Sequence, residues 1–504
     1  MDRRFQGRSG PFGARGCALL LACTALALTL GVAALFANSA PSFAGPRSYA
    51  TGSEPFAVAI GDLNGDGKPD LATANNDANT VSVLFNRGDG SFRAKLDYAT
   101  GSNPFSVAIG DLNGDGKPEL ATANYDADTV SVLLNSGGSL RPKLDYGTGH
   151  NPFSVAVGDL NGDGKPDLAT ANASGDPSTV SVLLNRGDGS FQPKLDYETG
   201  YIPQSVAIGD LNGDSKPDLA TADYGPSTVS VLLNRGDGSF QAPVYYLTGR
   251  GPHGVAIGDL NGDGKQDLAT ANQDFAGGVS VLLNNGDGSF QVKRDYQAGG
   301  NSGSVAIGDL NADGKPDLAA ANYGTDTISV LANNGDGSFQ AKRDFTTGHG
   351  PTRAAIGDVN GDAKPDLVSA NFDGNGVSVL INRGDGSFEA KRDFVDPGSE
   401  KRSIAIGDLS GDGRPDLATA NGDTDDASVF VNTTGACKVP NVKRKTVRAA
   451  KLALGRARCR VGKIRRAYSR SVKRGRVISE QPKAGTVLFS GKVNLVVSRG
   501  RRAS

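Results

Sequence analysis

The stretch GDLNGDGKPDLATAN, Gly61 to Asn75, recurs with small changes seven more times, and this repeat constrains the fold more than any other feature. The first aspartate of the motif stands at positions 62, 111, 159, 210, 259, 309, 358 and 408, which gives a spacing of 48 to 51 residues. Periods of about 40 to 50 residues with four short apolar runs per unit are typical of propeller blades. The repeat therefore predicts an all-β, eight-bladed β-propeller, or seven blades if one terminal unit is only partial.

The eighth unit stops at Asn432, before its fourth strand. The segment FAGPRSYATGSEPF, Phe43 to Phe56, matches FRAKLDYATGSNPF, Phe92 to Phe105, with an offset of 49 residues. An N-terminal strand can therefore complete the last blade, which would close the ring and cover a free sheet edge. We expect the propeller to occupy residues 45–436.

Residues 1–44 have the pattern of an export signal. Four arginines precede an apolar run from Cys17 to Ala37, and Ser42-Phe43-Ala44 is a small-x-small cleavage pattern. We predict a signal peptide cut before Gly45; an uncleaved membrane anchor is the alternative, because the run is long enough to span a bilayer. Both versions place the rest outside the cytoplasm, either secreted or associated with the cell wall.

Each repeat carries an oxygen-rich loop. In DLNGDGKPD, the side chains of Asp62, Asn64, Asp66 and Asp70 occupy loop positions 1, 3, 5 and 9, with Gly67 at position 6. Calcium takes 6 to 8 oxygen ligands from such a loop, whereas magnesium demands stricter geometry. Position 12 is Thr73 instead of the Glu of a helix-loop-helix site, and the flanks read as strands, so an EF-hand does not fit. A plain Asp/Asn/Gly turn without metal is the alternative.

The sequence therefore predicts up to eight Ca²⁺ ions. Their candidate ligands are Asp62, Asn64, Asp66, Asp70, Asp111, Asn113, Asp115, Glu119, Asp159, Asn161, Asp163, Asp167, Asp210, Asn212, Asp214, Asp218, Asp259, Asn261, Asp263, Asp267, Asp309, Asn311, Asp313, Asp317, Asp358, Asn360, Asp362, Asp366, Asp408, Ser410, Asp412 and Asp416.

These units resemble FG-GAP/VCBS repeats, the calcium-binding blades also found in integrin alpha-subunit propellers. The resemblance implies an extracellular, calcium-loaded propeller that binds or adheres. Glu119 and Ser410 depart from the pattern, and Ser215 and Ala363 replace the glycine at position 6. Because a non-glycine residue resists a left-handed backbone, we expect the fourth and seventh sites to be the weakest.

The repeats differ mainly in two sets of loops, those between the second and third strands and those between blades. By up-and-down topology these loops share one face of the ring, which is a candidate recognition surface. Its candidate residues are Tyr125, His150, Tyr201, Tyr224, Arg250, His253, Phe275, Tyr323, His349 and Phe372. Drift in unconstrained loops is the alternative explanation. The ligand would be an unknown glycan or protein.

Residues 437–504 form a second, basic module. They hold 21 of the 53 Lys and Arg residues and one acid, Glu480, whereas residues 45–436 hold 28 basic and 52 acidic residues. Thr446 can cap a helix with Val447, Ala450 and Leu454 at helical spacing, and Gly491 to Ser498 reads as a strand. The phrases VPNV, GRVISEQPKAGT and VNLVVSRG resemble a PASTA domain, which implies a small α+β module associated with bacterial peptidoglycan or acting only as a spacer.

The basic charge of this module favours peptidoglycan or another anionic wall polymer as partner, with nucleic acid less favoured for an exported chain. Once the leader is removed, Cys437 and Cys459 are the remaining cysteines, and export favours a disulfide between them over free thiols.

No nucleophile elbow, HExxH or phosphate loop occurs, so we expect a binding protein and not an enzyme. The predicted function is adhesion or extracellular recognition. A secreted polysaccharide-acting enzyme and a lectin, each with a site on the interblade-loop face, are the alternatives.

Overall fold

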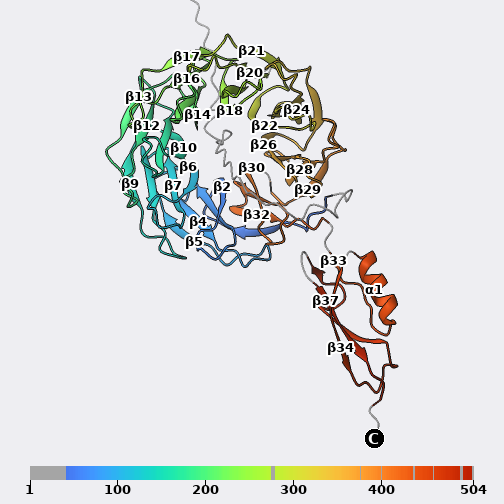
Figure 1. Ribbon diagram of the computed structural model, residues 1–504. Coiled ribbons are helices and arrows are strands. Elements are labelled where there is room, and N and C mark those ends of the chain that lie inside the picture. Colours follow the sequence, from blue (N-terminus) through green and yellow to red (C-terminus); the bar gives the residue numbers. More distant parts are fainter. Residues whose placement is uncertain are drawn as a thin grey trace, which may run out of the picture.

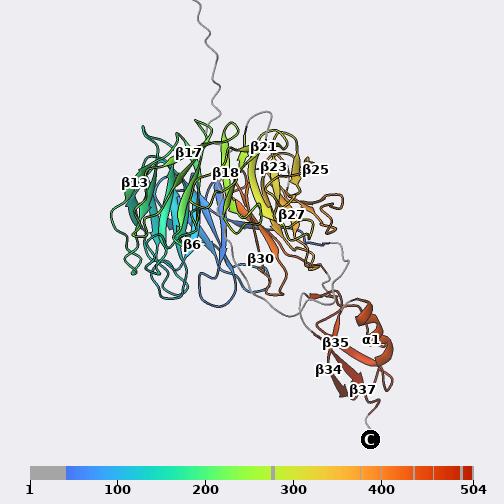
Figure 2. The same ribbon diagram turned by 45° about the horizontal axis from the view of Figure 1, so that its top comes forward.

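A computed structural model describes residues 41–501 except 274–277, 375, 399, 435–436, 458 and 489–491. The described residues form eight four-stranded antiparallel sheets around a central axis and a separate C-terminal domain (Figure 1). Turning the ring shows the sheets standing side by side like blades (Figure 2). The all-β propeller predicted from the repeat is confirmed, with eight blades in the described chain.

The blades are named 1 to 8 in chain order, and in each the first strand is the innermost. The first strands are β2 (Pro55–Gly61), β6 (Pro104–Gly110), β10 (Pro152–Gly158), β14 (Pro203–Gly209), β18 (Pro252–Gly258), β22 (Ser302–Gly308), β26 (Pro351–Gly357) and β30 (Lys401–Gly407). The second strands are β3 (Asp70–Asn75), β7 (Glu119–Asn124), β11 (Asp167–Asn172), β15 (Asp218–Asp223), β19 (Asp267–Asn272), β23 (Asp317–Asn322), β27 (Asp366–Asn371) and β31 (Asp416–Asn421).

The third strands are β4 (Thr80–Leu84), β8 (Thr129–Leu133), β12 (Thr179–Leu183), β16 (Thr228–Leu232), β20 (Gly278–Leu282), β24 (Thr327–Leu331), β28 (Gly376–Leu380) and β32 (Asp426–Phe430). The outer strands are β5 (Leu96–Ala99), β9 (Leu144–Gly147), β13 (Leu195–Glu198), β17 (Val244–Leu247), β21 (Arg294–Gln297), β25 (Arg343–Thr346), β29 (Arg392–Val395) and, for blade 8, β1 (Arg47–Ala50).

The apolar cores lie between neighbouring blades. One cluster joins Val81 and Val83 of blade 1 to Val107 and Leu120 of blade 2, and an equivalent cluster joins blades 8 and 1. The sheets approach closely, since a Cβ added to Gly61 would lie 3.1 Å from the Ile109 side chain. A single blade cannot bury its faces alone, so the ring is the folding unit.

The N-terminal strand closes the ring as predicted. In β1, Tyr49 pairs with Ala427 of β32, and Phe43 forms a bridge with Asn432. The Phe43 side chain is buried in the core of blades 7 and 8, where it contacts Phe394. The fold therefore begins before the predicted start at Gly45, because cutting there would remove this core aromatic ring.

Buried charges mark blade 8 and its contact with blade 1. Lys401 and Asp396 form an ion pair of 3.0 Å, and both side chains are fully buried. Arg402 is 4% exposed, pairs with Glu54 of blade 1, and lies 5.2 Å from the centre of the Phe56 ring. In the other seven blades, the residue at the position of Lys401 is Pro or Ser, so these charges distinguish blade 8.

The C-terminal domain is the small α+β module that was predicted. Helix α1 (Val447–Arg456) packs near a sheet of β34 (Arg460–Ala467), β37 (Lys492–Ser498) and β35 (Val477–Gln481), and β33 (Cys437–Lys438) pairs with β36 (Val487–Leu488). The Thr446 hydroxyl accepts a hydrogen bond from Ala449 N at 3.2 Å, which confirms the predicted cap. Ala450 and Leu454 are buried against Val477 and Val493.

Cys459 is buried and disulfide-bonded. The side chain of Cys437 lies outside the described residues, so the pairing of these two cysteines stays a prediction, which mass spectrometry of non-reduced peptides would check. The leader is also untested, because residues 1–40 lie outside the described part. Across the part that is described, no helix combines the length and apolarity needed to cross a bilayer.

Candidate metal-binding loops and the recognition face

Each oxygen-rich loop connects the first and second strands of its blade. In blade 1 the loop leaves β2 after Gly61, and Asp70 opens β3. Gly65 and Gly67 adopt left-handed φ values of 73° and 76°. These two positions coil the loop tightly, which only glycine does without strain.

The side chains at positions 1, 3 and 5 hold this coil by accepting backbone hydrogen bonds. In all eight loops the N–H of position 6 donates to the carboxylate of position 1, at 2.7–2.9 Å. In blade 1, Asn64 Oδ1 accepts from Asp66 N at 2.9 Å, and Asp66 Oδ1 accepts from Lys68 N at 3.1 Å. The predicted position-1, -3 and -5 residues therefore lie together in one short coil.

The acid at position 9 has a different environment. Asp70 is fully buried, with Oδ2 accepting from Leu63 N at 3.0 Å and Oδ1 from Asn86 N at 2.7 Å. Burial raises its pKa to about 6, and the charges of Asp66 and Asp62 contribute to this rise. The corresponding pKa is raised to about 6 in Asp167, Asp218 and Asp267, and to about 7 in Asp366 and Asp416.

The donor chemistry of these loops fits a hard cation. A carboxylate offers about four lone-pair sites, and Asp70 uses two of them for backbone N–H groups. The position-5 acid pairs with Lys68 at 2.7 Å, but both groups are about one-third exposed, so this weak pair can be displaced. Within the described residues, however, no three His, Cys, Asp or Glu side chains converge in the arrangement of a metal site. The ligand assignment therefore stays a prediction.

The expected irregular loops are visible in the backbone. Ser215 and Ala363, the two position-6 replacements, have left-handed φ values of 64° and 65°. Ala312, at position 4 of the sixth loop, is also left-handed at 61°, and our sequence reasoning did not single it out. In the eighth loop, Asp416 bonds the N–H of Ser410 instead of the position-2 N–H used elsewhere. Backbone strain thus affects the fourth, sixth and seventh loops.

A ring of asparagines connects the loops of neighbouring blades. Asn86 Nδ2 donates at 2.7 Å to the carbonyl of Leu409, the position-2 residue of the loop in the preceding blade. All eight blades repeat this bond, through Asn86, Asn135, Asn185, Asn234, Asn284, Asn333, Asn382 and Asn432. Sequence reasoning missed these residues because most of them stand before a Gly-Asp-Gly step, which indicates a hairpin turn within one blade and no contact with another.

A buried polar network runs across each blade. In blade 1, Asn75 Nδ2 donates to Ser82 Oγ at 2.8 Å, and Ser82 Oγ donates to Asp97 of the outer strand at 2.6 Å. In blade 4 the carboxylate of this network lies on the second strand instead of the outer strand, because Asp223 replaces the asparagine and Tyr245 replaces the outer aspartate. Ser230 donates to Asp223 at 2.6 Å instead. Burial raises the pKa of Asp223 to about 7, although hydrogen bonds from Ser230, Thr221 and Thr228 oppose this rise.

We expect the Asp223→Asn variant to flatten the pH dependence of stability. The folded state keeps the proton of Asp223 up to about pH 7, whereas the unfolded chain releases it near 3.8, the ordinary pKa of an aspartate. Its contribution is therefore fully present below pH 4 and is lost as the pH rises through 7, by on the order of 4 kcal/mol. The variant avoids this loss of stability at neutral pH, but part of the benefit is offset because Ser230 loses its carboxylate acceptor. Urea unfolding of both proteins from pH 4 to 8 measures the difference, and parallel curves would contradict it.

The antiparallel pairing places the two variable loop sets on one face of the ring, as predicted. Asp128, after the second strand of blade 2, accepts from Asn151 N in the following interblade loop at 2.8 Å. On this face Tyr201, Tyr224, His150, Arg250 and His349 are exposed, and Tyr125, Tyr323 and Phe372 are partly buried. Phe275 lies outside the described residues.

His253 does not belong to this surface. It lies within β18 and is 5% exposed, because the inner strand begins at Pro252, earlier than the loop assignment assumed. The other two histidines form matching pairs, with Nδ1 of His150 2.7 Å from Asp128 and Nδ1 of His349 2.7 Å from Asp326. These pairs stand on blades 2 and 6, four blades apart in the ring.

Comparison with family models agrees with this architecture. The model of the FG-GAP-like repeat matches residues 62–122, 111–170, 168–221, 210–270, 259–320, 309–369 and 358–419, which together cover more than half of the chain. The chain belongs to the FG-GAP-like repeat family. A PASTA domain model matches residues 438–499. An FG-GAP-like propeller joined to a PASTA domain fits an extracellular recognition or binding role.

Solved structures give the fold alone. Saccharomyces cerevisiae Sqt1 is similar at a TM-score of 0.56 and 15% identity, over 77% of this chain and 98% of that one. A lectin of Agrocybe aegerita, which recognises non-reducing terminal N-acetylglucosamine, is similar at a TM-score of 0.45 and 21% identity, over 73% and 99%. This second likeness is too weak to carry an argument about the FG-GAP-like chain. The curated proteins contain no match.

Proposed function

We propose that this chain is an exported calcium-binding propeller for adhesion or extracellular recognition, whose PASTA domain associates with peptidoglycan or another anionic wall polymer. The observation that carries this proposal is the separation of charge between the two modules. The propeller segment, residues 45–436, holds 52 acidic and 28 basic residues, whereas the tail holds one acid among 21 basic residues.

The basic module presents almost uniform positive charge to solvent. Its one acid, Glu480, is 4% exposed, whereas Lys463, Arg465, Arg466 and Arg470 on and beside β34 are exposed. Such a surface attracts a polyanion without needing a shaped pocket. In an exported protein, the polymers of the cell wall are the abundant partners of this kind.

Binding of the full chain to purified cell walls tests the wall assignment. Removing two exposed charges in Arg465→Gln/Arg466→Gln is expected to weaken retention roughly tenfold at low salt, since exposed ion pairs contribute up to about 1 kcal/mol each. The matched control is Arg93→Gln/Arg141→Gln, which removes two exposed charges from the propeller. Equal retention of the two variants, or retention unaffected by stripping the anionic polymers from the wall, would argue against the assignment.

Recognition by the propeller is proposed for the face that carries Tyr201, Tyr224 and the two His–Asp pairs. Exposed tyrosines at one end of a rigid scaffold are common binding elements. A screen of glycans and wall fragments with the full chain separates the candidate functions. Saturable binding without turnover supports a recognition module or lectin, whereas turnover that is lost in Tyr201→Ala would support an enzyme.

A further inference from the structure

The outer strand of blade 4 differs from those of blades 1–3 and 5–7, and blade 8, whose outer strand β1 reads RSYA, also lacks their ion pair. In six blades this strand carries a Lys–Asp ion pair at its surface, such as Lys194–Asp196 at 2.6 Å in blade 3. Charged side chains on an edge strand protect it from association. In blade 4 the equivalent residues are Pro243 and Tyr245, and Leu247 replaces the Glu198 of blade 3.

Tyr245 and Leu247 thereby extend an apolar position, Val244, that is similarly exposed in blades 1 to 3 as Leu96, Leu144 and Leu195. We call Val244, Tyr245 and Leu247 of β17 the blade 4 patch. Their side chains are 47%, 49% and 67% exposed. The blade accommodates Tyr245 because Asp223 takes over the hydrogen bond from Ser230 inside the sheet. Exposed Glu198 of blade 3 lies close to Tyr245, since its charge contributes, after burial, to the raised pKa of the tyrosine.

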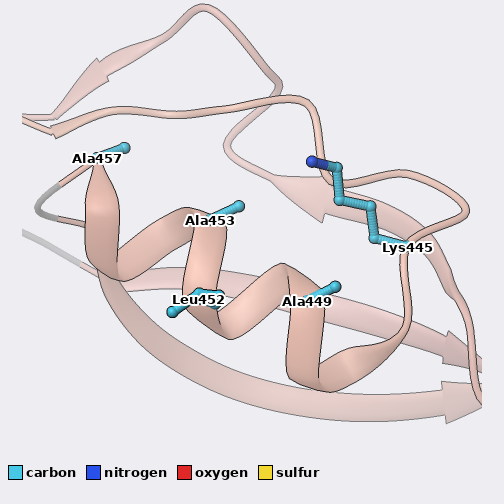
Figure 3. Close-up of a pocket in the computed structure, with 5 residues that line it drawn as sticks. All are labelled: Lys445, Ala449, Leu452, Ala453 and Ala457. Carbon is cyan, nitrogen blue, oxygen red and sulfur yellow. The ribbon is translucent and has the colours of Figure 1, made fainter.

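A second apolar surface lies on the C-terminal domain. A groove along α1 is lined by Lys445, Ala449, Leu452, Ala453 and Ala457, with the alanines on one side of the helix (Figure 3). Leu452 is 57% exposed. Lys445 stands at the end of this α1 groove, so the groove is an apolar strip with a cation beside it.

The two surfaces complement each other in charge as well as in apolar character. The blade 4 patch belongs to a strongly acidic module and is bordered by Glu198, whereas the α1 groove belongs to a strongly basic module and is bordered by Lys445. Interfaces are depleted of charge at the centre and polar at the rim, which matches both surfaces.

Within one chain these surfaces are kept apart. The C-terminal domain follows blade 8, and three Cα–Cα steps, spanning at most roughly 11 Å, connect Thr434 to Cys437. Blade 4 lies four blades away, on the opposite side of the eight-bladed ring from β33 (Figure 1). The complementary surfaces are therefore placed to meet between two copies.

We propose that this protein self-associates head to tail, with the α1 groove of one copy docked on the blade 4 patch of the next. Leu452 contacts Tyr245 and Leu247, and Lys445 faces Glu198 of the other copy. Such a heterologous contact leaves one free patch and one free groove at the ends, so the assembly can continue to grow.

Sedimentation of the full chain over a range of concentrations tests this association. We expect the mean mass to rise with concentration at low salt and to fall at high salt. Leu452→Glu should weaken association at least tenfold. The blade variant Asp223→Asn/Pro243→Lys/Tyr245→Asp/Leu247→Glu restores the charge pattern of blade 3 together with its internal network, and it should have the same effect. Val395→Glu, at a 66% exposed outer-strand position of blade 7, is the matched control and should change nothing.

Mixing the two variants identifies the mode of contact. The blade variant keeps an intact groove, and the Leu452 variant keeps an intact patch, so an equimolar mixture should form dimers that grow no further. A monomeric wild-type chain, a mixture that stays monomeric, or a Leu452→Glu variant that still self-associates would each overturn the proposal. Circular dichroism of each variant verifies its fold.

Discussion

A chelator is expected to lower the melting temperature of the full chain markedly, by more than any single substitution. A ligand that binds only the folded state stabilises it by about 2.7 kcal/mol per site at a hundredfold excess over Kd, and the chain offers up to eight loops. The physical reason is the position-9 acid. Asp70 is buried beside two other carboxylates, and its raised pKa records the cost of ionising it without a cation.

The pH dependence gives this prediction a second readout. Without metal, burial raises the pKa of the position-9 acids, to about 6 in Asp70 and about 7 in Asp366, so such a folded-state acid keeps its proton where the unfolded chain has lost it. Their contribution to stability is therefore lost as the pH rises through the raised pKa. Calcium should reverse this trend, because it binds the ionised form. Calorimetry with calcium, with magnesium and with chelator between pH 5 and 8 measures both effects. Identical melting curves with and without chelator would remove the metal assignment.

Replacing Lys401 by methionine is expected to destabilise the propeller by about 3–5 kcal/mol, because it leaves the buried carboxylate of Asp396 without its cation. Both side chains are fully buried, and the Lys401 ammonium lies 3.0 Å from Asp396 and 3.3 Å from the Gly398 carbonyl. Asp396 Oδ1 makes no hydrogen bond within the described residues, and after the lysine is removed the neutral amide of Asn421, which donates to Oδ2 at 3.3 Å, remains beside the carboxylate.

The double variant Asp396→Asn/Lys401→Met separates the charge from the packing. It removes both ions at once, so most of the lost stability should return. Denaturant unfolding of the wild type and of the two variants supplies the comparison. If the single and double variants unfold at the same denaturant concentration, the loss comes from packing and the ion pair has no special role.

The repeat in the sequence determined much of this fold. A 48–51-residue period with four apolar runs predicted the blades, and the 49-residue offset of Phe43–Phe56 predicted the closing strand. Thr446 and the spacing of Ala450 and Leu454 predicted α1. These features are local: turn chemistry, strand alternation and helix caps act within a few residues, so they can be recognised in a single sequence.

The tertiary structure decided which residues meet between blades and which side chains are buried. Asn86 bonds a carbonyl at Leu409, 323 residues away, and no local pattern indicates that contact. His253 was predicted to lie on the surface, but β18 begins at Pro252 and buries it. The sequence shows that Asp223 and Tyr245 replace an asparagine and an aspartate of blade 3. Only the structure shows that Ser230 donates its hydrogen bond to Asp223, which compensates for the lost outer aspartate. Ring closure brings distant segments together, and the energy of burying charge depends on that packing, which a one-dimensional repeat does not contain.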